Sequence, residues 1–257
     1  MKFQILIILL FIGMGSGCRS EKGNEAEPEQ KGVEETPLEK PEETTSENRG
    51  IIRGKVLYGG IPAELQPIPI DKDIEICGNK KKFSEELIVS KTDRGIKNVV
   101  VSIVGEGLKP APPSPTKLQL DQRGCWFYPH VQVISVGEPL EILNSDGILH
   151  NIHTLSIKNP PINKAQPGFK KKMEEKFEFP EIIKVKCDAH PWMGGWLVVA
   201  EHEYYTLTDE SGSFHMENVP AGIYTIEFWH ETLGKKTEEV QVKPNEEVKI
   251  EIQLNEK

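Results

Sequence analysis

Long apolar runs and helical periodicity are missing from this 257-residue chain. The apolar run Ile5 to Ile12 is too short to cross a bilayer stably. No long stretch repeats its apolar residues with the period of a helix. Glycine and proline are frequent instead, with 22 and 19 residues, and they separate short alternating segments. This pattern predicts an all-β fold, with a buried strand expected over 98–104 and further strands over 132–136 and 140–144.

Cysteine is also scarce, and basic residues are fewer than acidic ones. None of the four cysteines lies in a Cys-x-x-Cys-His motif, so covalent attachment of c-type haem is not indicated. The formal net charge is −9, which argues against a nucleic-acid partner, because such proteins carry a basic face. No general base, nucleophile or open substrate position stands out, so we expect that the protein is not an enzyme.

Residues 1–18 have the features of a targeting segment. Lys2 provides a positive start, an apolar stretch follows, and small residues precede Cys18. A cysteine directly after small residues resembles a bacterial lipobox, with Gly15 where that motif usually has leucine. The resemblance implies a lipoprotein signal peptide and a lipidated Cys18 that anchors an exported protein to the periplasmic or cell-surface side of a membrane. An ordinary secretory signal with a coincidental cysteine is the alternative.

Residues 19–50 are acidic, contain three prolines and almost lack large apolar side chains. Such a segment cannot bury enough apolar surface to offset the entropy that it would lose on ordering. We therefore expect a disordered tether that holds the folded part away from the membrane. The folded part begins near Ile51 and is long enough for one large or two small domains.

A metal-ligating pattern is centred on His190. Cys187, His190 and Met193 are spaced three residues apart, between strands predicted over 183–187 and 196–199. Their side chains leave the end of one strand, so they can converge on one point. Thiolate and thioether donors favour copper, and adding imidazoles suits a trigonal His2Cys site with a weak axial methionine. Zinc is disfavoured, because methionine is a poor zinc ligand.

The second imidazole has to come from elsewhere in the chain. His150 is the best donor, because it follows Asn144-Ser145-Asp146 closely and opens an extended run. His153 would point to the opposite face of the same strand, so we expect it to be a partly exposed polar residue.

With His150 included, the pattern resembles the cupredoxins, and its short loop is most similar to that of amicyanin. The similarity covers roughly residues 97–201. It implies one copper ion per chain, bound by His150, Cys187, His190 and Met193. It also implies that Asn151 locks the two ligand loops together, and that a backbone N–H near it bonds the Cys187 sulfur. In this family, electrons leave through the exposed ring edge of the histidine that corresponds to His190.

Two cysteines remain once Cys18 and Cys187 are assigned to lipid and metal. In an exported protein the pair Cys77 and Cys125 predicts a disulfide. The competing interpretation is a second metal site that uses Cys125 and His130.

Residues 202–257 change in character. The segments Thr208-Asp209-Glu210-Ser211-Gly212-Ser213-Phe214 and Pro220-Ala221-Gly222-Ile223-Tyr224 resemble a carboxypeptidase regulatory-like, or prealbumin-like, β-sandwich. That family has no catalytic residues to carry over. Because this stretch is short for such a sandwich, we hypothesise that residues 51–58 complete it and that the copper domain is inserted. His202, His215 and His230 are not expected to form a site.

The sequence thus predicts a cupredoxin-like copper domain with an N-terminal extension over 51–201, followed by a small β-sandwich over 202–257. We expect a lipid-anchored blue-copper protein that carries single electrons between redox proteins. The alternatives are copper delivery or storage with the same ligands, and a surface scaffold without metal.

Overall fold

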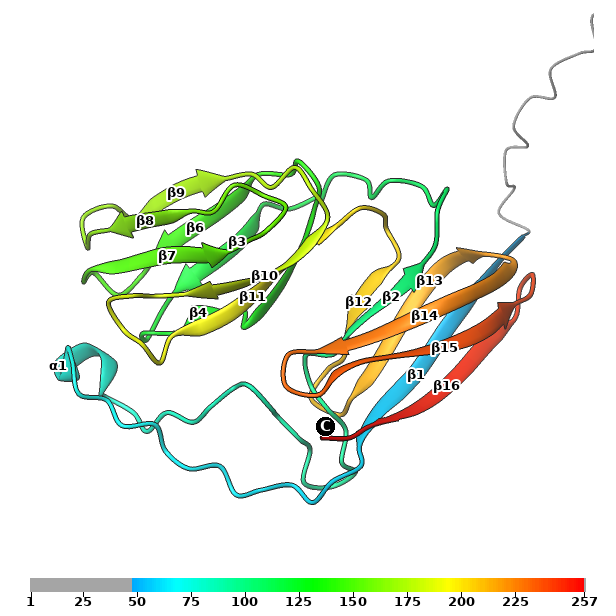
Figure 1. Cartoon of the computed structure of the whole chain (residues 1–257), viewed down its shortest axis with the longest axis horizontal. Helices are drawn as coiled ribbons and strands as arrows, with labels where there is room; N and C mark the ends of the chain where they lie inside the picture. Colours follow the sequence, from blue (N-terminus) through cyan, green and yellow to red (C-terminus); the bar gives the residue numbers. More distant parts are fainter. Residues whose placement is uncertain (1–47, 257) are drawn as a thin grey trace, which may run out of the picture. The chain divides into compact units, whose positions relative to one another are not determined.

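A computed structural model describes residues 48–256 and shows an almost entirely β-stranded protein with one short helix (Figure 1). The predicted all-β fold is confirmed. The predicted signal peptide, the lipidation of Cys18 and nearly all of the acidic tether lie outside the described residues. Within the described part of the chain, no helix is long and apolar enough to cross a membrane.

Residues 118–200 form two sheets around one apolar cluster. The five-stranded sheet has the order β5 (Val131–Ser135), β11 (Gly194–Ala200), β10 (Glu181–Lys186), β7 (His150–Leu155) and β8 (Asn163–Gln166). The four-stranded sheet has the order β4 (Phe127–Tyr128), β3 (Leu118–Gln122), β6 (Leu140–Asn144) and β9 (Lys172–Glu175). Side chains from both sheets meet in the buried cluster, among them Leu120, Phe127, Ile142, Ile183 and Leu197.

The remaining strands form a second pair of sheets. The three-stranded sheet has the order β13 (Ser213–Pro220), β1 (Arg49–Tyr58) and β16 (Glu247–Leu254). The four-stranded sheet has the order β12 (Tyr205–Leu207), β2 (Val100–Val104), β14 (Gly222–His230) and β15 (Gly234–Val242). Figure 1 shows the blue strand β1 beside the orange and red strands from the end of the chain.

Strand β1 joins the C-terminal strands. Ile52 is paired with Met216 of the antiparallel neighbour β13 and with Val248 of the parallel neighbour β16. This pairing is the one that the hypothesis of a sandwich completed by residues 51–58 requires.

Strand β2 departs from the domain boundary predicted by the sequence. It pairs with β12 and β14, so the strand expected over 98–104 does not belong to the sheets of residues 118–200. The physical reason is burial: Val101 and Ile103 pack in the same cluster as Ile226 and Phe228 of β14. Strands β1 and β2, which lie within the range 51–201 predicted for the copper domain, therefore belong to the C-terminal sandwich.

The hairpin of β10 and β11 positions the metal-ligating loop. Ile183 and Val185 of β10 are buried and alternate with the exposed Lys184, as expected for a strand with one face in the core. The antiparallel pairing ends at Lys186 and Gly194. The loop between them carries Cys187, His190 and Met193.

The extension between β1 and β2 contains the helix α1 (Ile74–Cys77). Cys77 at its end forms a disulfide with Cys125, which lies between β3 and β4. Cys125 is therefore not available as a metal ligand with His130, and the competing interpretation of this pair is wrong.

Candidate metal centre

Three of the predicted ligands converge in the interior. The Nδ1 atoms of His150 and His190 are 3.0 Å apart. The Sγ atom of Cys187 lies 4.0 Å from Nδ1 of His150 and 3.8 Å from Nδ1 of His190. All three side chains are buried, with at most 1% of their surface exposed. The structure thus brings together residues that are up to 40 positions apart in the sequence.

The triangle of donor atoms has the size that a transition-metal ion requires. From its three edges, the point equidistant from the donors lies about 2.1 Å from each of them, which compares with metal–nitrogen and metal–sulfur bonds of about 2.0–2.3 Å. One thiolate and two imidazoles fit copper or zinc by donor type. The residues present therefore fit a bound metal ion.

Each histidine uses its second ring nitrogen to bond a carboxylate. Nε2 of His150 lies 2.9 Å from Asp146, and Nε2 of His190 lies 2.9 Å from Asp73. A carboxylate accepts the proton carried by Nε2, which points Nδ1 of each ring toward the other donors. Both imidazoles are thus oriented toward the shared point before any ion binds.

Asp146 is itself fixed by the backbone. Its two carboxylate oxygens accept hydrogen bonds from the N–H groups of Gly124, at 2.5 Å, and Cys125, at 2.7 Å. These bonds lower the pKa of Asp146 together with the His150 bond, although burial acts in the opposite direction. The carboxylate therefore stays ionised beside His150.

The electrostatics favour a thiolate at Cys187. Burial raises the pKa of this thiol, but hydrogen bonds from His150 and from the backbone of Asn151, His190 and Ala189 lower it below its usual value. Burial also disfavours protonation of His150, yet the Asp146 carboxylate and the Cys187 sulfur raise its pKa to about 9. The thiolate is the form of cysteine that binds metals, and an incoming cation replaces a proton in this pocket.

Asn151 connects the two ligand-bearing segments. Its Oδ1 atom accepts hydrogen bonds from the backbone N–H of Asp188, at 2.6 Å, and of Ala189, at 3.3 Å. Its own backbone N–H lies 3.5 Å from the Cys187 sulfur. Asn151 thus makes the two contacts that the cupredoxin resemblance implied.

Met193 closes the ligand loop. Its backbone oxygen accepts the N–H of Cys187 at 3.1 Å, and its own N–H donates to the backbone oxygen of His190 at 2.9 Å. The side chain is fully buried in the same apolar cluster as Cys187. Its role as a metal ligand stays a prediction.

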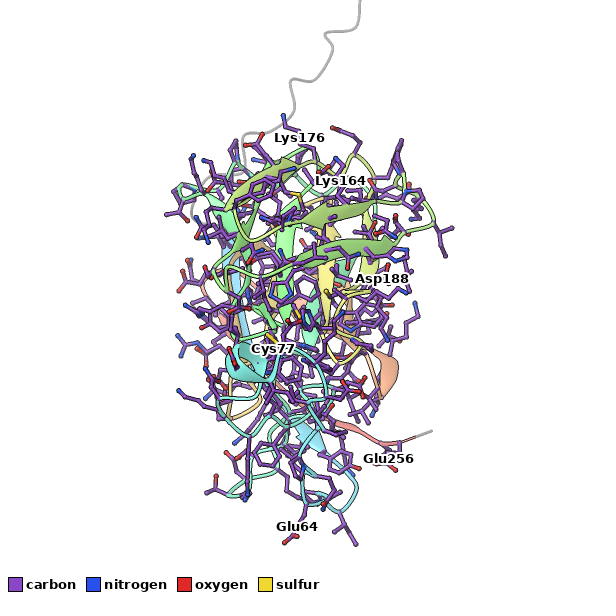
Figure 2. The ribbon with its side chains drawn as sticks, turned by 90° about the vertical axis from the view of Figure 1, so that its left-hand side faces the viewer. Glu64, Cys77, Lys164, Lys176, Asp188 and Glu256 are labelled. Carbon is purple, nitrogen blue, oxygen red and sulfur yellow. A yellow bond between two sulfur atoms is a disulfide. The ribbon has the colours of Figure 1, made fainter. Side chains whose placement is uncertain are left out.

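His190 differs from the sequence-based expectation. Its ring is fully buried, so the predicted exposed edge is absent and that expectation is wrong. Asp73 covers Nε2, and the Trp192 ring lies 5.2 Å away between centroids. Asp73 lies 117 positions from His190 in the chain, and no pattern in the sequence connects the two residues. Figure 2, in which the left-hand side of Figure 1 faces the viewer, labels Cys77, which forms the disulfide with Cys125.

The other histidines lie apart from these donors. Nδ1 of His153 is 2.8 Å from Asp188, and its side chain is partly exposed, as predicted. His130 hydrogen-bonds Glu231 instead of joining a metal site with Cys125. Among the described residues, neither His202, His215 nor His230 belongs to a group of close metal-ligating atoms.

No protein-family model and no curated protein matches the chain. Solved structures that align with it include a copper-containing nitrite reductase from Thermus scotoductus, at 25% identity over 39% of this chain and 26% of that one, with a TM-score of 0.32. A purple cupredoxin from Nitrosopumilus maritimus aligns at 23% identity over 33% of this chain and 100% of that one, with a TM-score of 0.28. Amicyanin from Paracoccus versutus aligns at 16% identity over 39% and 97%, with a TM-score of 0.29. The chain thus spans about a quarter of the reductase and nearly all of each small cupredoxin.

Proposed function

We propose that the chain binds one copper ion through His150, Cys187, His190 and Met193 and carries single electrons as a blue-copper protein. The observation that carries the proposal is the convergence of one thiolate and two imidazole nitrogens at separations of 3.0, 3.8 and 4.0 Å. A copper ion would supply the one-electron couple.

Copper is favoured over zinc by the fourth side chain. A thioether is a soft donor that suits copper as a weak axial ligand, whereas structural zinc sites take cysteine, histidine or carboxylate. Met193 follows His190 by three positions and is buried with Cys187, so it is the best available candidate for that position.

The protein environment suits rapid electron exchange. Asp146, Asp73 and Asn151 hold the donor-bearing segments in place through hydrogen bonds, so little has to move when the charge of the centre changes by one. The potential would be set by the axial residue and by the hydrogen bonds around the Cys187 sulfur.

Export and membrane attachment belong to the same proposal. The Cys77–Cys125 disulfide is typical of an oxidising compartment, as expected outside the cytoplasm. We propose that a lipid on Cys18 anchors the chain, and that its partner is another redox protein rather than nucleic acid. We also propose that it carries electrons without being an enzyme.

Copper storage or delivery is the second candidate. The complete burial of His190 favours it, because a partner cannot touch this ring directly. A storage protein would use the same donors but would hold Cu(I) and release it to a competing ligand.

The test is the visible spectrum and copper content of the protein after loading with Cu(II). Electron transfer predicts an intense thiolate-to-copper band with one copper per chain, lost in Cys187→Ala. His153→Ala is the matched control, because His153 is a nearby histidine outside the donor triangle, and it should keep the band. A colourless protein that holds Cu(I) tightly would indicate storage. Absence of bound copper would refute both functions and leave the surface scaffold.

A further inference from the structure

A short segment outside the cupredoxin-like region reaches the metal centre. Residues 70–77, here called the strap, end in α1 and are fixed to Cys125 by the disulfide of Cys77. Ile70 and Ile76 of the strap pack against the apolar cluster that contains Cys187 and Met193. The strap is therefore packed against the same apolar core that carries Cys187 and Met193.

Two polar contacts join the strap to the ligand loop. Oδ2 of Asp73 lies 2.9 Å from Nε2 of His190. Nζ of Lys72 donates to the backbone oxygen of Ala189 at 3.1 Å. Adjacent strap residues thus bond adjacent loop residues, which fixes the strap in one register.

The backbone of the strap is shaped to present Asp73. This residue adopts a left-handed conformation, with φ of 48°, just before α1. Its carbonyl accepts the N–H groups of Ile76 at 3.0 Å and Cys77 at 2.8 Å. The turn that places the carboxylate over His190 is the same turn that leads into the disulfide.

The other half of the disulfide supports the second histidine. The N–H of Cys125 donates to Oδ2 of Asp146 at 2.7 Å, and that oxygen also accepts from Nε2 of His150. The two cysteines of one disulfide therefore hydrogen-bond, through their backbone N–H groups, the two aspartates that orient the metal-binding imidazoles.

We propose that Asp73 is a positioning residue of the copper site, held over His190 by the Cys77–Cys125 disulfide. This inference rests on the proposed function. Asp73 fixes the proton of His190 on Nε2, keeps Nδ1 as the donor and adds a negative charge beside the ring. It also covers the ring edge, so a redox partner has to approach the centre from another side. The added negative charge stabilises Cu(II) more than Cu(I) and lowers the reduction potential.

The test uses Asp73→Asn and Asp73→Gly, because Asn and Gly both tolerate a positive φ and leave the turn unstrained. Asp71→Asn is the matched control: it removes the same charge from an exposed strap residue two positions away. We expect both Asp73 variants to weaken Cu(II) binding about 10–100-fold, as is usual when a partner of a ligating histidine is lost. We expect the potential to rise in both, and Asp71→Asn to behave as the original protein.

A second readout needs no copper. Nitrogen-15 NMR of the histidine rings in the copper-free protein should show His190 protonated on Nε2, and a mixture of tautomers in Asp73→Gly. Unchanged tautomer, affinity and potential in the Asp73 variants would overturn the inference even if the blue band is present. A protein that never shows the band, yet shows the tautomer change, would refute the proposed function while Asp73 still orients His190.

Discussion

Replacing Asn151 with alanine should destabilise the protein strongly, because its side chain joins strand β7 to the ligand loop between β10 and β11. Its Oδ1 atom accepts two backbone N–H groups of the ligand loop, at 2.6 and 3.3 Å. Its Nδ2 atom donates to Asn163 at 2.9 Å. Each such bond contributes about 1 kcal/mol, and buried donors left without an acceptor cost more, so we expect a loss of about 2–4 kcal/mol in the free energy of unfolding.

Urea denaturation of the copper-free protein, followed by tryptophan fluorescence, measures this loss. Asn163→Ala is the matched control, because Asn163 is exposed: it accepts one Asn151 bond, and its own bonds to Asp188, at 3.1 Å, and to His153, at 3.3 Å, are open to solvent. We expect the control to lose less than about 1 kcal/mol. Equal, small losses in both variants would refute the role of Asn151 as the link between the ligand segments. The backbone N–H to the Cys187 sulfur survives in Asn151→Ala, so any blue band should weaken rather than vanish.

Two further predictions concern the C-terminal sandwich. Phe228→Ala should lower the free energy of unfolding by about 3–5 kcal/mol, because this ring is fully buried, whereas Ile223→Ala on the same strand should cost less than about 0.5 kcal/mol since Ile223 is exposed. Denaturation curves compare the two, and similar losses would contradict the assigned core. Burial lowers the pKa of His230 from 6.5 to about 4, so the unfolded chain gains a proton before the folded one as the pH falls. Stability should therefore drop by up to about 3 kcal/mol between pH 6.5 and 4, and His230→Asn should drop less; the same drop in both proteins would reject this cause.

The strands and the ligand loop could be predicted from local sequence patterns. The alternation of Ile183, Lys184 and Val185 indicates a half-buried strand, and β10 covers it. The strand expected over 140–144 coincides with β6, and that over 132–136 is shifted by one residue in β5. The three-residue spacing of the loop donors is likewise a local property, so two of the three convergent donors could be named without knowledge of the fold.

Which strand each element pairs with, and which side chains it contacts, could not be predicted from local sequence patterns. The strand over 98–104 looks like any buried strand, and only its pairing with β14 assigns it to the C-terminal sandwich. The exposed edge of His190 was implied by the cupredoxin resemblance, and the neighbours of His190 in the chain do not reveal that Asp73 covers its ring. Asp73, its actual partner, is 117 positions away in a segment without periodicity.

The sequence by itself therefore determined which side chains could bind a metal, because donor chemistry and spacing are local. Tertiary structure alone decided how those side chains are oriented and covered. The disulfide of Cys77 and Cys125 brings a distant turn over the ligand loop, and the carboxylates of Asp73 and Asp146 then orient His190 and His150. The contact of Asp73 with His190 depends on chain segments that meet only after folding, so no local pattern encodes it, whereas Asp146 lies only four positions before His150.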